Sequence, residues 1–311
     1  MIYKNMSGRL GNQMFQYATM YAFSKENNDN DIALNFNHLE NETFIDDLKS
    51  FQADYRTVQK EPTLNITQSV LLSFVKTVSL IINRLYAKDV TKRLQKISTL
   101  DNRLFKRFMK HGIYHVEQGY IPLQKSRNKN KIFIGCFESA QYFDKYRNDI
   151  LQQFTPKQPP LQSNNKIYSA INKTQSVCIT IRRGDFVDNA SLKKRQYVCT
   201  PEYFYRAIKE IQDRIKDPSF FIFSDDINWV KNNMIFPTGT IFENGNNPVW
   251  EKLRMMYSCK HFIISNSSFS WWAQYLSRNQ SKIVIAPTRW KNGYQNKDIF
   301  QPNWILVNPD E

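Results

Sequence analysis

The sequence predicts an α/β fold made of two Rossmann-like lobes that face a central cleft. Short apolar runs rich in Val, Ile and Phe alternate with helix-like stretches, which is typical of a parallel sheet covered on both faces. A segment rich in Pro, Asn and Gln at 154–166 interrupts this alternation midway along the chain. The length of 311 residues also favours two domains. We therefore expect lobes at 1–153 and 167–311, joined by a linker at 154–166.

The first lobe begins with a strand, a Gly-containing loop and a helix. The strand is IYKNM, the loop is GRLGNQ (8–13), and the helix is MFQYATMYAFSKEN (14–27). Further strands are expected at DIALNF (31–36) and KIFIG (131–135), with a long basic helical region between them and a helix over 139–154.

The second lobe contains five strand-like runs with helices between them. The runs lie at 177–182, 220–224, 240–242, 262–265 and 282–287. The clearest helix is 201–216, because Thr200 fits an N-cap, Pro201 the first helical position and Glu202 the first turn. In open parallel sheets ligands bind beyond the carboxyl ends of strands, and the notable polar residues of this sequence fall there.

The net charge of +15 is unevenly distributed. Residues 76–110 hold ten Lys or Arg against two Asp, and 124–131 adds four more basic residues. Such runs are compatible with a solvated helical face, an anionic membrane surface, a nucleic acid or the steering of an acidic ligand. Aromatic residues are not interleaved with these runs, which disfavours nucleic-acid binding.

Other features of the composition point to a cytosolic protein. The four cysteines show no CxxC spacing and are expected to be reduced, mostly packed thiols. The N-terminus lacks the pattern of a signal peptide. The most apolar stretch, 70–82, contains Lys76 and is shorter than the roughly 18 apolar residues of a spanning helix, so no transmembrane segment is expected. His111 and His115 are expected to form a surface pair and not a metal site.

The stretch ITIRRGDF (179–186) places two arginines where a buried strand ends. Arg182 and Arg183 would point into the cleft, where paired guanidinium groups suit phosphate oxygens. Gly184 would allow a tight turn, and Asp185 could orient one of the arginines. The alternative is a purely structural ion pair.

Two further strand ends in this lobe carry polar residues. In ISNSSFSWW (264–272), Asn266, Ser267 and Ser268 could cap a helix whose free N–H groups form an anion site, while the two tryptophans are expected to pack. In FIFSDDINWV (221–230), Asp225 and Asp226 could hold a divalent metal, accept from a ribose or a guanine edge, or cap the next helix.

One class of reaction uses arginines, helix-start hydroxyl groups and acidic base readers around a cleft, namely transfer from a nucleotide sugar. The departing diphosphate gains negative charge in the transition state, and cationic side chains and N–H dipoles lower that barrier without a metal.

The motifs also resemble, in their order, those of the bacterial α-1,2-fucosyltransferases of glycosyltransferase family 11. The matching stretches, which span residues 8 to 290, are GRLGNQMFQYA, TIRRGDF, FSDDINWV, NSSFSWWAQYL and IAPTRW. The resemblance implies a GT-B fold with an acceptor-side first lobe and a donor-binding second lobe. It also implies GDP-β-L-fucose as the donor, inversion at the anomeric carbon, and no required metal or other cofactor.

The resemblance assigns roles to individual residues. Catalytic roles fall to Arg182, Arg183 and Asp185, with Arg182 nearest the leaving oxygen. Donor contacts fall to Asn12, Gln13, Thr180, Ser224, Asp225, Asp226, Asn266, Ser267, Ser268 and Phe269. Asp225 or Asp226 would read guanine. Candidates for a general base are Asp185, Asp188 and Glu138. One departure is Thr180, which stands where the family motif often has histidine and can supply at most a hydroxyl group.

The expected reaction attaches fucose to the 2-hydroxyl group of a galactose-type residue on an oligosaccharide or surface glycan. A galactose-terminated, lipid-linked acceptor would suit a protein of the bacterial cytoplasm whose basic first lobe rests on the inner face of the membrane. Alternatives are another GDP-sugar or linkage, a metal-dependent transferase that uses Asp225 and Asp226, and, remotely, a basic nucleic-acid-binding protein.

Overall fold

The computed structural model describes residues 1–40, 44–293 and 296–310. The chain divides into two compact units, which are described separately. Unit 1 comprises Met1–Thr155 and Asn296–Phe300, and unit 2 comprises Pro156–Gln295 and Gln301–Glu311. The division after Thr155 lies inside the expected linker, but the rest of that segment belongs to unit 2. There it forms a 3₁₀ turn, η5 (Gln162–Asn164), and leads into α6 (Asn165–Lys173).

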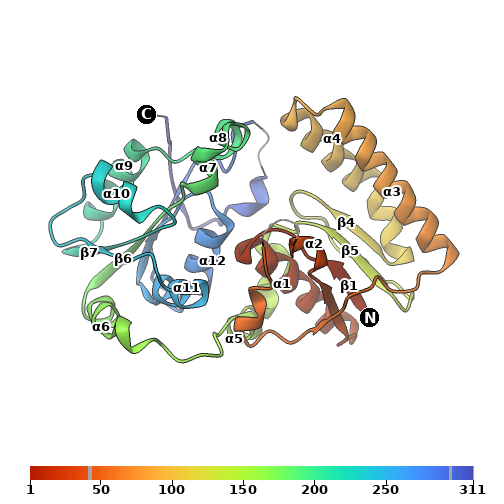
Figure 1. The fold of residues 1–311 in the computed structure, drawn as a ribbon, viewed down its shortest axis with the longest axis horizontal. Helices are drawn as coiled ribbons and strands as arrows, with labels where there is room; N and C mark the ends of the chain where they lie inside the picture. The colour runs from red at the N-terminus through yellow and green to blue at the C-terminus, as the bar shows by residue number, and fades with distance from the viewer. Residues whose placement is uncertain (41–43, 294–295, 311) are drawn as a thin grey trace. The chain divides into compact units, whose positions relative to one another are not determined.

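Unit 1 is built on a five-stranded parallel sheet with the order β3-β2-β1-β5-β4. Figure 1 labels β1, β5 and β4 of this sheet. Its strands are β1 (Ile2–Asn5), β2 (Ile32–Asn35), β3 (Arg56–Thr57), β4 (Ile113–Val116) and β5 (Lys131–Gly135). Three of them confirm expected strands. β3 and β4 were not predicted.

Helix α1 (Leu10–Asn27) is almost wholly buried and forms much of the core of unit 1. Phe23 packs edge-on against Tyr114 of β4 and Phe133 of β5, with ring centroids 4.9 and 5.2 Å apart. The helix begins four residues earlier than predicted, so most of the expected loop is its first turn. The turn that precedes it is made by Gly8, whose φ of +73° favours glycine.

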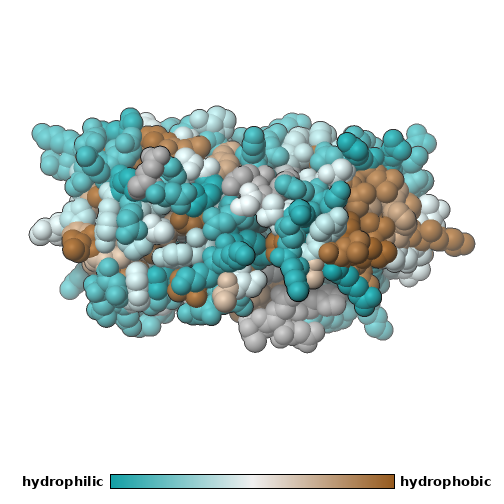
Figure 2. Space-filling view, turned by 90° about the horizontal axis from the view of Figure 1, so that it is seen from above, coloured by the Kyte–Doolittle hydropathy of each residue, from teal (hydrophilic) through white to brown (hydrophobic). Residues whose placement is uncertain are grey.

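A helical layer follows β3 along the chain and contains α3 (Ile66–Leu85), α4 (Val90–Arg103) and the 3₁₀ segment η2 (Phe105–His111). Asn65 and Gln68 form a capping box that fixes the start of α3. With 20 residues and a mean hydropathy of 1.4, α3 is long and apolar enough to cross a membrane. It exceeds the apolar stretch that the sequence suggested because it begins at Ile66. Figure 2 shows a large hydrophobic area over this part of unit 1.

The remaining short elements of unit 1 complete its connections. They are α2 (Asn37–Glu40), η1 (Leu48–Ser50), η3 (Ala140–Tyr142), η4 (Asp144–Tyr146), α5 (Arg147–Gln153) and η6 (Lys297–Ile299). The helix expected over 139–154 is therefore wrong as a single element, because Phe143, with φ −135° and ψ −2°, separates two 3₁₀ turns.

The expected histidine pair is also wrong as a surface feature. His115 lies in β4, is 5% exposed, and its Nδ1 is 2.5 Å from the buried carboxylate of Asp101 on α4. The other carboxylate oxygen of Asp101 accepts the Glu117 N–H at 2.9 Å. The pair thus joins α4 to the sheet.

Unit 2 contains a six-stranded parallel sheet with the order β11-β10-β9-β6-β7-β8. The strands are β6 (Gln175–Ile181), β7 (Pro218–Ser224), β8 (Ile241–Phe242), β9 (His261–Ile263), β10 (Val284–Pro287) and β11 (Ile305–Val307). The chain fills one side of β6 first and then returns to fill the other, which is the doubly wound Rossmann order. With unit 1, this confirms the expected α/β class with two Rossmann-like units. The cleft between them stays a prediction.

The helices of unit 2 cover this sheet. After α6 they are α7 (Gly184–Asp188), α8 (Ala190–Gln196), α9 (Pro201–Gln212), α10 (Ile227–Asn233), α11 (Val249–Ser258) and α12 (Ser268–Leu276). Helix α9 buries Phe204, Ala207, Ile208 and Ile211 against alternate residues of β6, a spacing that places one face of the helix in the core. All four cysteines are free thiols, and three are buried, as expected.

Candidate active site

The candidate active site lies where the winding of the unit 2 sheet reverses. β6 and β9 are parallel neighbours, with Ile179 opposite Ile263. The chain leaves β6 toward β7 on one side and later leaves β9 toward β10 on the other. In doubly wound sheets this switch point opens a crevice at the carboxyl ends of the strands. The segment after β6 carries the two arginines, and the segment after β9 carries Ser267 and Ser268.

Arg182 is held by carboxylates from two different segments. Its Nη1 contacts Asp225 Oδ2, which follows β7, and its Nη2 contacts Asp185 Oδ1 on α7. The guanidinium group also lies 5.2 Å from the ring centroid of Phe186. Two ion pairs and a ring fix its direction, and 16% of the side chain remains exposed.

Arg183 occupies a similar but separate setting. Its backbone N–H donates to Asp225 Oδ1 at 2.9 Å, and its Nε donates to Asp226 Oδ2 at 3.4 Å. The guanidinium carbon is 3.2 Å from the ring centroid of Trp229 on α10. Trp229 was not among the predicted site residues, although it lies four residues after Asp225 in a motif that the sequence had singled out.

Gly184 is required because a larger residue would clash with its neighbours, and not because its backbone φ is unusual. A Cβ at this position would lie 2.5 Å from Asp225 Oδ2 and 3.9 Å from Arg182 Nη1. The expected tight turn is therefore a close approach between the segments that follow β6 and β7.

The cluster around the two arginines is not cationic by itself. Two guanidinium groups face three carboxylates, those of Asp185, Asp225 and Asp226. Helix α8, which packs beside α7, adds Lys193, Lys194 and Arg195. The structural ion pairs that the sequence offered as an alternative are present, and they leave the arginines oriented at the switch point.

The segment after β9 presents the start of α12. Ser267 is the N-cap residue, and its side chain makes no capping hydrogen bond. Ser267, Ser268 and Phe269 are half-buried. The side-chain cap expected from Ser267 is therefore wrong. Both tryptophans of the motif are fully buried, which confirms that they pack.

Asn266 binds protein and not open space. Its Nδ2 donates to the carbonyl groups of Gln196 and Trp290 at 2.8 and 2.9 Å, and its Oδ1 lies 3.6 Å from Cys199 Sγ. These bonds tie together the segments that follow α8, β9 and β10. Burial raises the pKa of Cys199 to about 12, so this thiol is not a nucleophile at neutral pH.

Thr180 and Ser224 have structural partners as well. The Thr180 hydroxyl is buried in β6 and accepts the Ser265 N–H at 3.1 Å. The Ser224 hydroxyl donates to the Ile181 carbonyl at 2.8 Å and accepts the Asp226 N–H at 3.0 Å. Asp226 in turn caps α10 by accepting from the Trp229 N–H. These bonds position the ends of β6, β7 and β9 relative to one another.

The remaining predicted residues lie in unit 1 or at the edge of α7. Asn12 is in the first turn of α1. Gln13 is fully buried and bonds to Gly8, Ile45 and Asp47 backbone groups at 2.8 to 3.2 Å, so its amide is occupied by the protein.

Two of the three base candidates are not part of the arginine cluster. Asp188 is exposed at the end of α7. Glu138 is buried in unit 1 directly after Phe137, whose φ of +56° is unusual for a bulky residue. Asp185 belongs to the cluster and pairs with Arg182.

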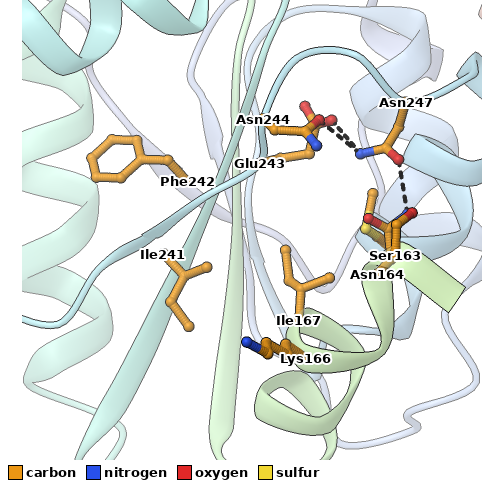
Figure 3. Close-up of a pocket in the computed structure, with 10 residues that line it drawn as sticks. Ser163, Asn164, Lys166, Ile167, Ile241, Phe242, Glu243, Asn244 and Asn247 are labelled. Carbon is orange, nitrogen blue, oxygen red and sulfur yellow. Dashed lines mark hydrogen bonds between the residues drawn. The ribbon is translucent and has the colours of Figure 1, made fainter.

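A separate pocket of about 250 Å³ lies in unit 2 beside the carboxyl end of β8 (Figure 3). None of its lining residues was predicted. Asn247 Nδ2 donates to Glu243 at 2.7 Å, and Asn164 Nδ2 donates to Asn247 at 2.8 Å. Lys252 lies 3.3 Å from the buried Glu243 carboxylate. None of the residues that line the pocket belongs to the arginine cluster, so we assign the pocket no part in the candidate active site.

Comparison with known proteins identifies the family. The model of Glycosyl transferase family 11 matches residues 35–308. The chain belongs to glycosyltransferase family 11. This match includes the segments after β6, β7 and β9 and confirms the resemblance to family 11.

Three proteins of known name match over nearly the whole chain. An α-1,2-colitosyltransferase of Escherichia coli is 31% identical, with 97% of each chain covered. The O-antigen biosynthesis glycosyltransferase WbnK of Escherichia coli is 25% identical over 98% of this chain and 99% of its own. A galactoside α-(1,2)-fucosyltransferase 1 of Rattus norvegicus is 21% identical over 97% and 72%. Among solved structures, the NodZ α-1,6-fucosyltransferase co-crystallized with GDP has 9% identity and a TM-score of 0.46 over 88% of this chain and 91% of its own.

Proposed function

We propose that this family 11 glycosyltransferase moves L-fucose from GDP-β-L-fucose to the 2-hydroxyl group of a galactose-type residue, with inversion. The observation that carries the proposal is the orientation of Arg182 by Asp185 and Asp225 at the switch point of the unit 2 sheet. The names of the family 11 relatives, which transfer colitose or fucose in α-1,2 linkage, support the linkage.

In this mechanism the arginines act on the leaving group. The acceptor 2-hydroxyl oxygen bonds to the anomeric carbon of fucose as the bond from that carbon to the β-phosphate oxygen breaks. Negative charge grows on the diphosphate, and Arg182 donates to the oxygen that departs. A guanidinium group has five N–H donors, so Arg182 can keep its two carboxylate contacts and still reach a phosphate oxygen.

The start of α12 supplies a second group of donors for the diphosphate. The side chain of the N-cap residue makes no capping hydrogen bond, and we propose that the first N–H groups of this helix donate to the diphosphate. Ser267 and Ser268 can add hydroxyl donors there. The buried tryptophans of α12 keep the helix in place without the donor.

The proton of the acceptor hydroxyl must leave after or during attack. Asp185 already accepts from Arg182, which favours a role in orienting that arginine over a role as the base. Asp188 and Glu138 are the other candidates. Guanine recognition by Asp225 or Asp226 would require either carboxylate to accept from the base while it holds its arginine.

A second candidate donor is the GDP derivative of colitose, a sugar that lacks the 3-hydroxyl group of fucose. The 31% identity to an α-1,2-colitosyltransferase favours it. The deciding experiment compares kcat/KM for GDP-fucose and GDP-colitose with a panel of galactose-terminated acceptors, followed by linkage analysis. Fucose transfer to the 2-hydroxyl group supports the proposal, whereas a preference of about tenfold or more for GDP-colitose would reassign the donor.

We further propose that the reaction needs no metal, because both aspartates that could ligate one accept from arginines. We expect the acceptor to be a surface glycan intermediate in the bacterial cytoplasm.

A further inference from the structure

Helix α3 has two apolar faces, and only one of them packs on unit 1. The inner face buries Leu72, Val75 and Ile82. Five of its exposed apolar residues lie on the outer face: Ile66, Val70, Phe74, Ile81 and Leu85, with exposed fractions of 84%, 63%, 43%, 50% and 72%. At about 100° per residue they fall within an arc of roughly 100°, so they form one continuous stripe. We call these five residues the outer stripe.

The outer stripe is large for the surface of a water-soluble domain. It runs the length of a 20-residue helix, which is about 30 Å. Figure 2 shows this region as a hydrophobic area bordered by hydrophilic residues. Contiguous exposed apolar patches of this kind mark surfaces that bind a partner or a membrane.

Basic side chains surround the outer stripe. Arg84 lies on the same face of α3, three residues after Ile81. Exposed cations in the segment 76–110 are Lys76, Arg84, Lys88, Lys92, Lys96, Arg103, Lys106, Arg107 and Lys110. The only two acidic residues of this segment do not offset that charge outward, since Asp89 caps α4 beside Lys92 and Asp101 is buried against His115.

The charge of this surface distinguishes between its possible occupants. A second copy of the chain would bring its own excess of Lys and Arg against these cations. An anionic bilayer offers both acyl chains for the apolar residues and negative headgroups for the basic ones. Arginine and lysine beside an apolar stripe can bury their stems while the charged ends stay at the headgroups.

The inner face argues that α3 lies along a membrane and does not cross one. Only 22% of the most apolar 18 residues of α3 are buried. The contacts of the inner face with unit 1 nevertheless include Gln68, whose Nε2 donates to the carbonyl groups of His111 and Asn130 at 3.0 and 2.8 Å. Insertion across a bilayer would break these bonds and expose Leu72 and Val75. A helix that lies in the interface keeps them.

We propose that the outer stripe and the basic residues of 76–110 dock unit 1 on an anionic lipid bilayer, with α3 parallel to the membrane plane. The proposal goes beyond the transferase activity and does not rest on it, because vesicle binding needs neither donor nor acceptor.

The test is flotation of the full chain with vesicles of phosphatidylcholine alone and of phosphatidylcholine mixed with phosphatidylglycerol. We expect binding to the anionic vesicles that is about tenfold or more tighter than to the neutral ones, and that weakens as salt rises. The variant Val70→Asp/Ile81→Asp should lose at least about tenfold in binding, and Lys92→Glu/Lys96→Glu should lose the preference for anionic lipid.

Matched controls come from unit 2. Ile235 is 84% exposed, so Ile235→Asp repeats the apolar change elsewhere, and Lys209→Glu/Lys216→Glu repeats the charge change. Both should bind as the parent does. If the aspartate pair lowers the melting temperature, Val70→Ser/Ile81→Ser makes the same test with a milder change.

Three outcomes would overturn the proposal. The first is equal partition of the protein into neutral and anionic vesicles, and the second is unchanged vesicle binding by the α3 variants. The third is a dimer that forms in solution without vesicles and that Ile81→Asp dissociates into monomers. Transfer to a soluble oligosaccharide, measured in parallel, should be the same for all of these variants, so a failure here remains distinct from a failure of the proposed activity.

Discussion

Asp225 reaches Arg182 from the neighbouring strand, with Oδ2 on Nη1, while its Oδ1 accepts the Arg183 N–H at 2.9 Å. One carboxylate thus fixes both the side chain of the first arginine and the backbone of the second. Because β6 and β7 are paired along seven residues, the sheet holds the segments that follow these strands side by side. The guanidinium groups are oriented without a donor, and in the mechanism proposed above this would lower the reorganisation required when the diphosphate leaves.

Arg182→Lys should lower kcat/KM for donor hydrolysis and transfer by about a hundredfold or more, because one ammonium cannot contact two carboxylates and a phosphate oxygen with the same fork. Steady-state GDP release measures the effect. The matched control is Arg214→Lys, an exposed arginine of unit 2 that pairs with Glu210 and should retain full activity. Turnover within a few-fold of the parent would refute the role given to Arg182.

Gly184→Ala should lower kcat/KM by about tenfold, since the new Cβ would lie 2.5 Å from Asp225 Oδ2 and displace that carboxylate from Arg182. Gly239→Ala is the comparison, because its Cβ meets no atom within 4 Å and its φ of +83° affects stability alone. Equal activity of the two variants would show that the spacing at Gly184 has no catalytic consequence.

Thr180→Val should cost about 1 to 3 kcal/mol of unfolding free energy, because it leaves the buried Ser265 N–H without its acceptor. Thr180→Ser keeps the hydroxyl and should retain most of the stability. Denaturant unfolding and donor KM are measured together. A large rise in donor KM at unchanged stability would instead place the Thr180 hydroxyl against the nucleotide.

Excess chelator should leave the transfer rate within about twofold of the untreated rate, since the aspartates after β7 are paired with arginines. Rates are measured after dialysis against chelator, and added Mg²⁺ or Mn²⁺ is the control. Loss of activity that these ions restore would favour the metal-dependent alternative.

The buried Lys4 should make the stability of the protein depend on pH. Burial lowers the pKa of Lys4 in β1 to about 8, and its Nζ donates to the Gly135 carbonyl at 2.8 Å. The unfolded chain binds the Lys4 proton more tightly than the folded chain does. Burial of charged Lys4 therefore lowers the free energy of unfolding fully below pH 8, and this loss shrinks as the pH rises toward the pKa of the unfolded chain. Between pH 7 and 9 the parent should gain about 1 kcal/mol relative to Lys4→Met in denaturant unfolding. A parallel pH profile for the two proteins would contradict this.

The α/β class and most strands could be predicted because buried parallel strands form short apolar runs. β4 was missed because its sequence, IYHV, contains a histidine that is buried in the sheet by pairing with Asp101 of α4. β3 was missed because it has two exposed residues. Both strands depend on tertiary contacts that the hydrophobic periodicity of the sequence does not predict.

The position of the arginines could also be predicted, because a strand end fixes where a side chain emerges. The partners of amides could not. Gln13 and Asn266 look like ligand contacts in the sequence, yet backbone carbonyls and N–H groups from remote segments occupy them. The sequence also could not predict that three carboxylates surround the two guanidinium groups, because Asp225 and Asp226 lie over forty residues away from the arginines.

The return of residues 296–300 to unit 1 affects how hybrid enzymes should be built. Asn296 donates to the Glu138 carbonyl at 3.0 Å, and Asp298 accepts the Tyr120 N–H at 2.8 Å. A chimera spliced only after Thr155 would import this pentapeptide from the other parent and mismatch it with its own loops. Exchange of unit 1 between family members therefore requires transplanting two non-contiguous pieces together.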